Sequence, residues 1–207
     1  MQMSEERQLA TRPEEPASRI ATLVADLAAS IPDSRELAAV HPDERAKALV
    51  QSAALRSAAI SGALALPPGP LGIVTIIPDL KMIWGIQQQL VADIASCFGK
   101  RSALTQEVMV YCLFRHGAAL LVRDLAVRVG ERMLIRRVAL RSMQKILQSI
   151  GIRATQKAIA SSVSRYVPIL GAMGVGGYSY YDTSKVGATA LELFSKEIEI
   201  APEEGVQ

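Results

Sequence analysis

The side chains best suited to catalysis or metal binding are few in this 207-residue chain, and they lie far apart in the sequence. There are two histidines, His41 and His116, and two cysteines, Cys97 and Cys112. Neither histidine has a cysteine or carboxylate at metal-ligand spacing, and the cysteines lie in apolar helical patterns that favour burial. No Ser/His/Asp, Cys/His or paired-carboxylate arrangement is visible. We therefore expect no catalytic residues, no metal and no cofactor.

One catalytic spacing does occur near the end of the chain. Tyr181 and Lys185 are separated as in the Tyr-x-x-x-Lys pair of short-chain dehydrogenases, in which the tyrosine acts as the acid/base. Those enzymes also need a strand, a glycine-rich turn and a helix to hold a dinucleotide, and no such unit opens this chain. The match is therefore weak, and we do not expect a dehydrogenase.

A glycine-rich run at residues 171–177 precedes that pair. It lacks the Lys-Ser/Thr of a phosphate-binding P-loop, and no G-x-G-x-x-G register fits it. Small residues at this density more often let helices pack closely, especially in or near lipid. We therefore interpret Gly171 and Gly174 as packing positions rather than as a phosphate site.

The strongest signal in the sequence is a cationic segment at residues 115–165. It contains eleven lysines and arginines and two acidic residues, so it carries +9, although the whole chain carries +3. If the segment is helical, side chains four residues apart share one flank and concentrate this charge. The two series that recur in this way are Arg128, Arg132 and Arg136, and Arg137, Arg141 and Lys145.

A cationic helical surface of this kind is typical of proteins that bind anionic partners. Lipid headgroups are the partner that we favour, because apolar segments accompany the charge. Nucleic acid is the alternative, although the chain has no helix-turn-helix pattern and lacks the interleaved aromatic residues of single-strand binders. A solvated helix face with counterions is the third interpretation.

Two uncharged stretches bear on membrane insertion. Residues 57–78 are long enough to span a bilayer, but Pro67, Pro68 and Pro70 divide them. Residues 166–181 are shorter and contain a proline and four glycines. Half-length apolar segments with such breaks are typical of buried, re-entrant or interfacial hairpins rather than of a simple transmembrane helix.

Periodicity and local start and stop signals predict the helices of the first half. A short amphipathic helix is expected at residues 18–29 and a longer one at residues 43–65. The clearest helix runs from Asp79 to Phe98. Asp79 can accept hydrogen bonds from the free amides of the first turn, and Gly99 ends the helix.

Gln87 lies in the centre of the apolar face of that helix, among Ile83, Trp84, Val91 and Ile94. A buried amide needs partners, so we expect it to pair with another helix or with backbone. Its replacement by leucine would be near neutral or stabilising if only shape matters. It would destabilise by about 1–3 kcal/mol if a partner is left unpaired.

The second half is expected to be helical throughout. A helix beginning near Ser102 continues to about residue 149, with breaks near Gly117 or Gly130, and Gly151 separates it from a basic amphipathic helix.

Asp182 and Thr183 are expected to cap a final helix that ends near Lys196. The chain would then comprise a disordered tail (residues 1–17), a short helical segment (18–42), a helical domain (43–198) and an acidic tail (199–207).

The chain resembles the EcsC protein family, and the related helical domain found beside some bacterial GTPases, over about residues 43–196. The resemblance rests on Ile-Ile-Pro-Asp-Leu at 76–80, Ile-Ala-Ser-Cys-Phe-Gly-Lys at 94–100 and Tyr-Val-Pro-Ile-Leu-Gly-Ala at 166–172. It implies a bacterial, helical, membrane-associated accessory protein, and it supplies no catalytic residues to carry over.

These patterns predict an all-α protein, a helical bundle of six to eight helices with Pro/Gly-broken apolar hairpins. We expect a non-enzymatic membrane-associated adaptor, with a cationic nucleic-acid-binding protein as the alternative. The polar, acidic N-terminus does not read as a signal peptide, so we expect the chain on the cytoplasmic side, peripheral or partly inserted in the inner membrane. The expected partners are an anionic membrane surface and a protein or second copy of the chain.

Overall fold

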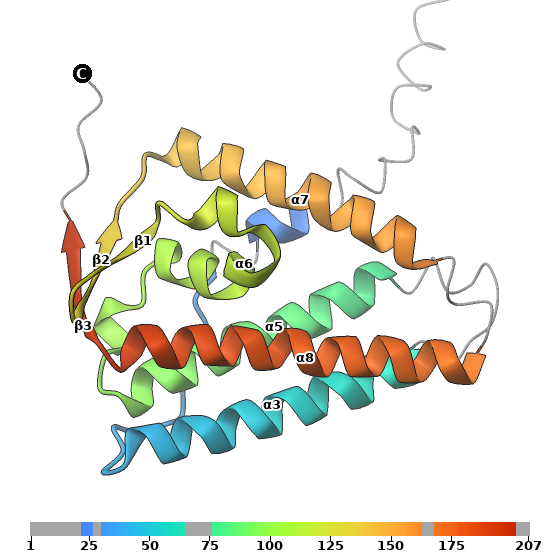
Figure 1. Ribbon diagram of the computed structural model, residues 1–207, viewed down its shortest axis with the longest axis horizontal. Helices are drawn as coiled ribbons and strands as arrows, with labels where there is room; N and C mark the ends of the chain where they lie inside the picture. Colours follow the sequence, from blue (N-terminus) through green and yellow to red (C-terminus); the bar gives the residue numbers. More distant parts are fainter. Residues whose placement is uncertain (1–21, 27–29, 65–75, 163–167, 202–207) are drawn as a thin grey trace, which may run out of the picture.

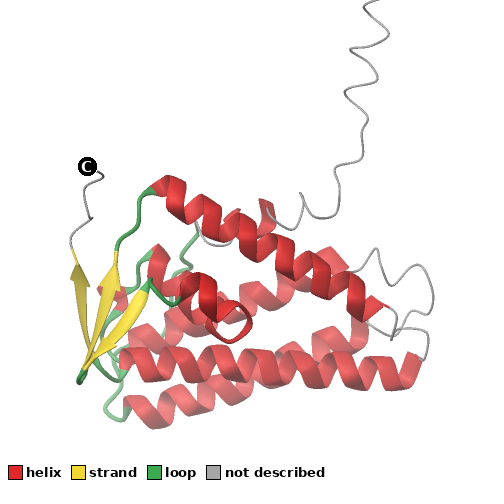
Figure 2. Cartoon of the chain, turned by 45° about the horizontal axis from the view of Figure 1, so that its top comes forward, coloured by secondary structure: helices red, strands yellow, loops and turns green. Residues whose placement is uncertain are grey.

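The computed structural model describes residues 22–26, 30–64, 76–162 and 168–201. In this part of the chain the protein is a bundle of helices with one small sheet at one end (Figures 1 and 2). The mostly helical class expected from the sequence is confirmed. The sheet was not expected, and the helices with defined bounds number six, at the lower end of the expected range.

The helices are α3 (Pro42–Leu64), α5 (Ile76–Cys97), the short 3-10 helix η1 (Arg101–Ala103), α6 (Gln106–Val122), α7 (Leu140–Ser162) and α8 (Pro168–Phe194). The strands are β1 (Ala126–Val129), β2 (Arg132–Arg136) and β3 (Glu197–Ala201). A further helical turn occupies residues 22–26 and places Val24 in the core.

The long helices α3 and α8 lie side by side and antiparallel, and α5 packs against both (Figure 1). α6 packs on α8 and α5, and α7 crosses over α6 on the side of the bundle away from α3. Aliphatic residues of α5 and α6 fill the centre, and Trp84 meets Phe114 edge to face with ring centroids 5.6 Å apart.

Two of the expected helix boundaries are confirmed. α3 begins at Pro42, where the fixed φ of proline suits a first turn. α5 ends just before Gly99, which has a φ of +67°. The amide of Gly99 donates to the carbonyl of Ser96, and that of Lys100 to Ala95, both at 2.8 Å. This is the paired hydrogen-bond pattern of a Schellman C-cap, which glycine adopts without strain.

The helical run expected from Ser102 to about residue 149, with breaks near Gly117 or Gly130, is wrong in its start and in its middle. Residues 101–103 form η1, and α6 starts after Thr105, whose hydroxyl accepts from the amide of Val108. α6 kinks at Ala118, next to Gly117, and the chain leaves the helix after Val122. Thr105, and not Ser102, is therefore the N-cap of the helix. Its hydroxyl accepts a hydrogen bond from one of the first-turn amides that have no partner within the helix.

A β-hairpin, β1–β2, replaces the middle of that helix, with its turn at Gly130, whose φ is +62°. Breaks near Gly117 and Gly130 are therefore present, but the chain between them turns into strand. Arg128 lies on β1 and Arg132 and Arg136 lie on β2, so the three do not share one helix flank. Our interpretation of this arginine series is corrected accordingly.

The end of the chain also differs from the expectation. α7 continues through Gly151, and α8 starts at Pro168, so Asp182 and Thr183 lie in mid-helix and cap nothing. Glycine costs a helix interior about 1 kcal/mol, a penalty that packing against neighbouring helices outweighs here.

β3 pairs in parallel with β2, so residues 199–201 of the expected acidic tail belong to the sheet. Ile198 and Ile200 lie beside Met133 and Ile135 on the core side. On the other face, Glu197 is the register partner of Arg132. The folded domain thus extends past the boundary expected at residue 198.

The proline-rich turn at Pro67, Pro68 and Pro70 lies outside the described residues. α3 ends at Leu64 and α5 begins at Ile76, and the two helices pack against each other. The start expected at Asp79 is three residues late, because α5 begins at Ile76 and Asp79 falls within its first turn. None of the helices that the structure describes is long and apolar enough to cross a bilayer.

Candidate functional site

A half-buried polar cluster joins α5, α6 and α8 around the carboxylate of Asp182. Its Oδ1 accepts from the phenol of Tyr178 at 3.1 Å and lies 2.7 Å from Nε2 of His116, while its Oδ2 accepts from Nε2 of Gln87 at 2.8 Å. The same Gln87 nitrogen donates to the hydroxyl of Thr183 at 3.2 Å. Gln87 is fully buried and pairs with another helix, as its place on the apolar face predicted.

The electrostatics of the cluster favour an ionised Asp182. Burial raises the pKa of this carboxyl, but the hydrogen bonds from His116, Gln87 and Tyr178 and the charge of His116 outweigh burial and lower it overall. The side chains of Asp182 and His116 are only 16% and 20% exposed, so solvent screens the pair weakly. The cluster is therefore a half-buried, charged hydrogen-bond centre shared by three helices.

An Asp–His pair can orient an imidazole as a general base, so the surroundings of His116 decide whether the cluster is catalytic. Among the described residues no hydroxyl or thiol hydrogen-bonds to His116. Cys112, one turn earlier on α6, is completely buried, and burial raises the pKa of its thiol. A protonated buried thiol is a poor nucleophile. The arrangement therefore favours a structural role that ties three helices together at the α6 kink.

Gln87→Leu is expected to lower the free energy of unfolding by about 1 kcal/mol. The substitution removes a donor from the Asp182 carboxylate, which stays buried. It also removes the Gln87 Oε1 atom, which is buried and has no partner among the described residues, and this offsets part of the loss. Urea denaturation measures the change. Unaltered or increased stability would mean that Asp182 does not need this donor.

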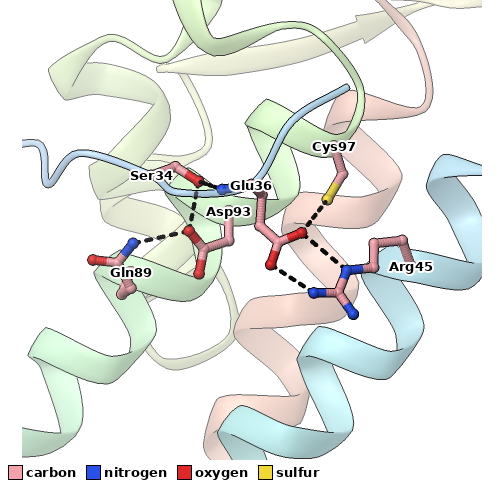
Figure 3. A network of polar contacts seen from close by, with 6 residues as sticks. All are labelled: Ser34, Glu36, Arg45, Gln89, Asp93 and Cys97. Atoms are coloured by element: carbon pink, nitrogen blue, oxygen red, sulfur yellow. Dashed lines mark hydrogen bonds and ion pairs between the residues drawn. The ribbon is translucent and has the colours of Figure 1, made fainter. Parts of the chain in front are cut away.

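A second polar network holds residues 30–41 against the bundle (Figure 3). Arg45 of α3 donates two hydrogen bonds to Glu36, at 2.6 and 2.9 Å, and these lower the pKa of that carboxyl. Ser34 donates to Asp93 of α5 at 2.6 Å. Cys97 contacts Glu36 at 3.9 Å, and burial raises the pKa of its thiol. This network fastens a segment of chain and holds no activated nucleophile.

Half of the eight cations that start the cationic segment are neutralised within the fold. This pairing includes the acidic strand β3, so charges that are separate in the sequence meet in space. The pairs are Arg115 with Glu192, Arg123 with Asp124, Arg128 with Glu131, and Arg132 with both Glu197 and Glu199.

The other four cations, Arg136, Arg137, Arg141 and Lys145, are exposed and form no ion pair within the described residues. We call them the α7 cationic patch. Arg136 ends β2, Arg137 follows it, and Arg141 and Lys145 lie one turn apart on α7. The first turn of α7 contains no acidic residue, so the positive end of the helix dipole adds to their potential. Four of the six arginine and lysine positions predicted from the sequence thus gather around the start of α7.

The Tyr181–Lys185 spacing forms an exposed contact instead of a catalytic pair. Nζ of Lys185 lies 5.2 Å from the ring centroid of Tyr181, a cation–π distance, and Tyr181 is 56% exposed. The tyrosine ring packs under the ammonium group on the surface of α8.

Close helix packing is confirmed for the glycine-rich run, but at a different glycine. A Cβ on Gly176 would lie 2.9 Å from the carbonyl oxygen of Ala58 on α3, whereas one on Gly174 would meet nothing within 4 Å. The surroundings of Gly171 lie outside the described part. Gly187 is also tight, against the side chain of Val50.

Sequence reasoning missed both His116 and Asp182 as members of one cluster. They are 66 positions apart and carry no local signal. The one available indication was Gln87, a polar residue in an apolar stripe that required a partner. In comparisons with known proteins, no family model, curated protein or solved structure matches this chain.

Proposed function

We propose that the protein is a non-enzymatic adaptor that binds an anionic membrane surface through the α7 cationic patch. The observation that supports this most directly is that four cations of the segment have acidic partners in the fold, whereas the four of the α7 cationic patch have none among the described residues. The fold supplies acidic partners for Arg115, Arg123, Arg128 and Arg132 and leaves the other four exposed.

Leaving these cations unpaired has an energetic cost. Arg141 and Lys145 are four residues apart on α7, and like charges at this spacing destabilise a helix by a few tenths of a kcal/mol. Arg141 also lies at the helix start, where the dipole disfavours a cation. An arrangement that opposes stability in this way is typical of a surface kept for a charged partner.

An exposed leucine in the patch favours lipid over nucleic acid. Leu140, between Arg137 and Arg141, is 69% exposed, and Ile152 further along α7 is 47% exposed. Apolar side chains flanked by cations suit the boundary between headgroups and acyl chains. Phosphate contacts to a nucleic acid would leave Leu140 in water. We further propose membership of the EcsC family, on the residues of α5 and α8 quoted above.

The double reversal Arg137→Glu/Arg141→Glu tests this function. A cation near an anionic leaflet contributes about 1 kcal/mol, so loss of two should weaken binding to phosphatidylserine-containing vesicles at least about 30-fold. Binding to purely zwitterionic vesicles should change little. Co-sedimentation at low and high salt measures both affinities.

Arg35→Glu/Lys47→Glu is the matched control, because it changes the net charge equally at exposed positions away from α7. It should leave vesicle binding nearly unchanged. The α7 variant should not lose stability, since a glutamate at position 141 would face Lys145 one turn on and complement the helix dipole. Equal loss of vesicle binding in both variants would mean that net charge, and not the α7 cationic patch, determines binding. Tight binding to duplex DNA with no binding to vesicles would mean that the partner of the patch is nucleic acid and not a membrane surface.

A further inference from the structure

The fold brings the two uncharged stretches of the sequence together at one end of the bundle. α3 carries no charged residue from 57 to its end at Leu64, and α8 carries none from its start at Pro168 to Tyr181. The helices are antiparallel, so both uncharged ends point the same way, away from the sheet (Figure 1). We call residues 57–64 and 173–181 the uncharged pole.

Charged residues begin at the same level on both helices. Gly187 packs on Val50, and Gly176 lies beside Ala58 and Gly62. In this register Arg56, the last charged residue of α3, is level with residues 178–181 of α8. Asp182 and Lys185 follow there directly. On α3 and α8 the uncharged residues therefore end at a common level.

Three tyrosines lie at that edge. Tyr178, Tyr180 and Tyr181 are 45%, 40% and 56% exposed, and Met173, further out on the pole, is 70% exposed. Tyrosine has an apolar ring and a polar hydroxyl, and it collects where a membrane protein passes from lipid to water. An exposed methionine beyond a tyrosine edge is the order expected along a path from headgroups towards acyl chains.

The dimensions fit one leaflet. From Pro168 to residues 178–181, α8 extends about 15–20 Å at 1.5 Å per residue. Half of the hydrocarbon core of a bilayer is about 15 Å thick.

We propose that the uncharged pole enters one leaflet of a bilayer, with Tyr178, Tyr180 and Tyr181 at the headgroup level. This inference rests on the proposed membrane-surface function and names the part of the chain that contacts acyl chains. The α7 cationic patch lies at the start of α7, at the sheet end of the bundle, so in this placement it contributes longer-range attraction to the anionic surface, and the pole supplies attachment that salt does not remove. The occupant of this face is lipid, rather than a second copy of the chain.

Site-specific labelling tests the contact directly on the full chain. An environment-sensitive fluorophore is attached to the cysteine of Met173→Cys. The matched control is Leu37→Cys, because Leu37 is 84% exposed and lies on the segment before α3. The native cysteines are at most 1% exposed and should not react in the folded protein. With phosphatidylserine-containing vesicles we expect a blue shift and quenching by acyl-chain spin labels at position 173, and neither change at position 37.

A second variant measures the energetics. Met173→Glu should lower partition into vesicles at high salt at least about tenfold, because salt screens the cationic patch and leaves the apolar contribution. Leu37→Glu should not lower it. Both positions are exposed, so neither variant should unfold the protein.

The outcomes separate the two proposals. Vesicle binding with a solvent-like label at position 173 would overturn the pole and leave the cationic patch standing. A blue shift at 173 on zwitterionic vesicles, with no effect of Arg137→Glu/Arg141→Glu, would support the pole and overturn the patch. A concentration-dependent shift without vesicles would assign the pole to a second copy of the chain. Absence of vesicle binding would overturn both.

Discussion

Replacing Asp182 with alanine is expected to lower the free energy of unfolding by about 3 kcal/mol, the largest loss that we expect from one substitution. The carboxylate lies between side chains of three helices, and its removal leaves the buried Gln87 amide with Thr183 alone and deprives His116 of its hydrogen-bond partner. Urea denaturation of the full chain at neutral pH measures the change.

Asp33→Ala is the control for that measurement. Asp33 makes a single long ion pair of 3.8 Å with Arg101 and its side chain is fully exposed, so its loss should cost little. A loss below about 1 kcal/mol for Asp182→Ala would show that the cluster does not hold the helices together.

The same carboxylate should make stability depend on pH. Its pKa in the folded state is lowered, so its contribution is complete above the pKa of an unfolded aspartate, about 4. The contribution is lost as the pH falls through the lower folded value. The difference in stability between the native chain and Asp182→Asn should therefore shrink as the pH is lowered below about 4.

Local signals in the sequence identified elements that need no distant partner. Pro42 begins α3 and Gly99 ends α5, because fixed φ and the left-handed conformation act within a few residues. The β1–β2 hairpin was missed because Val127, Arg128 and Val129 suit a strand or a cationic helix equally well. Pairing with β3, more than sixty residues later, settles the conformation, and no local pattern reports it.

The candidate site shows the same limit more strongly. Asp182 and Thr183 have the residue types of a helix cap, and their actual partners come from α5 and α6. Only Gln87 indicated the cluster from the sequence, because a buried amide must have a hydrogen-bond partner. Likewise the sequence does not show that β3 brings Glu197 and Glu199 beside Arg132, whereas Arg141 and Lys145 form no ion pair within the described residues.

Gly176→Ala is expected to lower the free energy of unfolding by about 2–3 kcal/mol. The added methyl group would lie 2.9 Å from the carbonyl oxygen of Ala58, and 3.6 Å from the Cα of Gly62. These are backbone atoms, so the clash is relieved only by moving α3 away from α8. That movement would loosen the contact along which the two uncharged helix ends meet.

Gly177→Ala, one residue along, provides the matched comparison. A Cβ at Gly177 would meet nothing within 4 Å, and this position too lies inside α8. Alanine there should stabilise the helix by about 0.5–1 kcal/mol, because it reduces the conformational freedom of the unfolded chain. The midpoints of thermal and urea unfolding should therefore both fall for Gly176→Ala and both rise for Gly177→Ala. Equal shifts would mean that helix propensity, and not the approach of α3 to α8, determines how this glycine-rich run tolerates substitution.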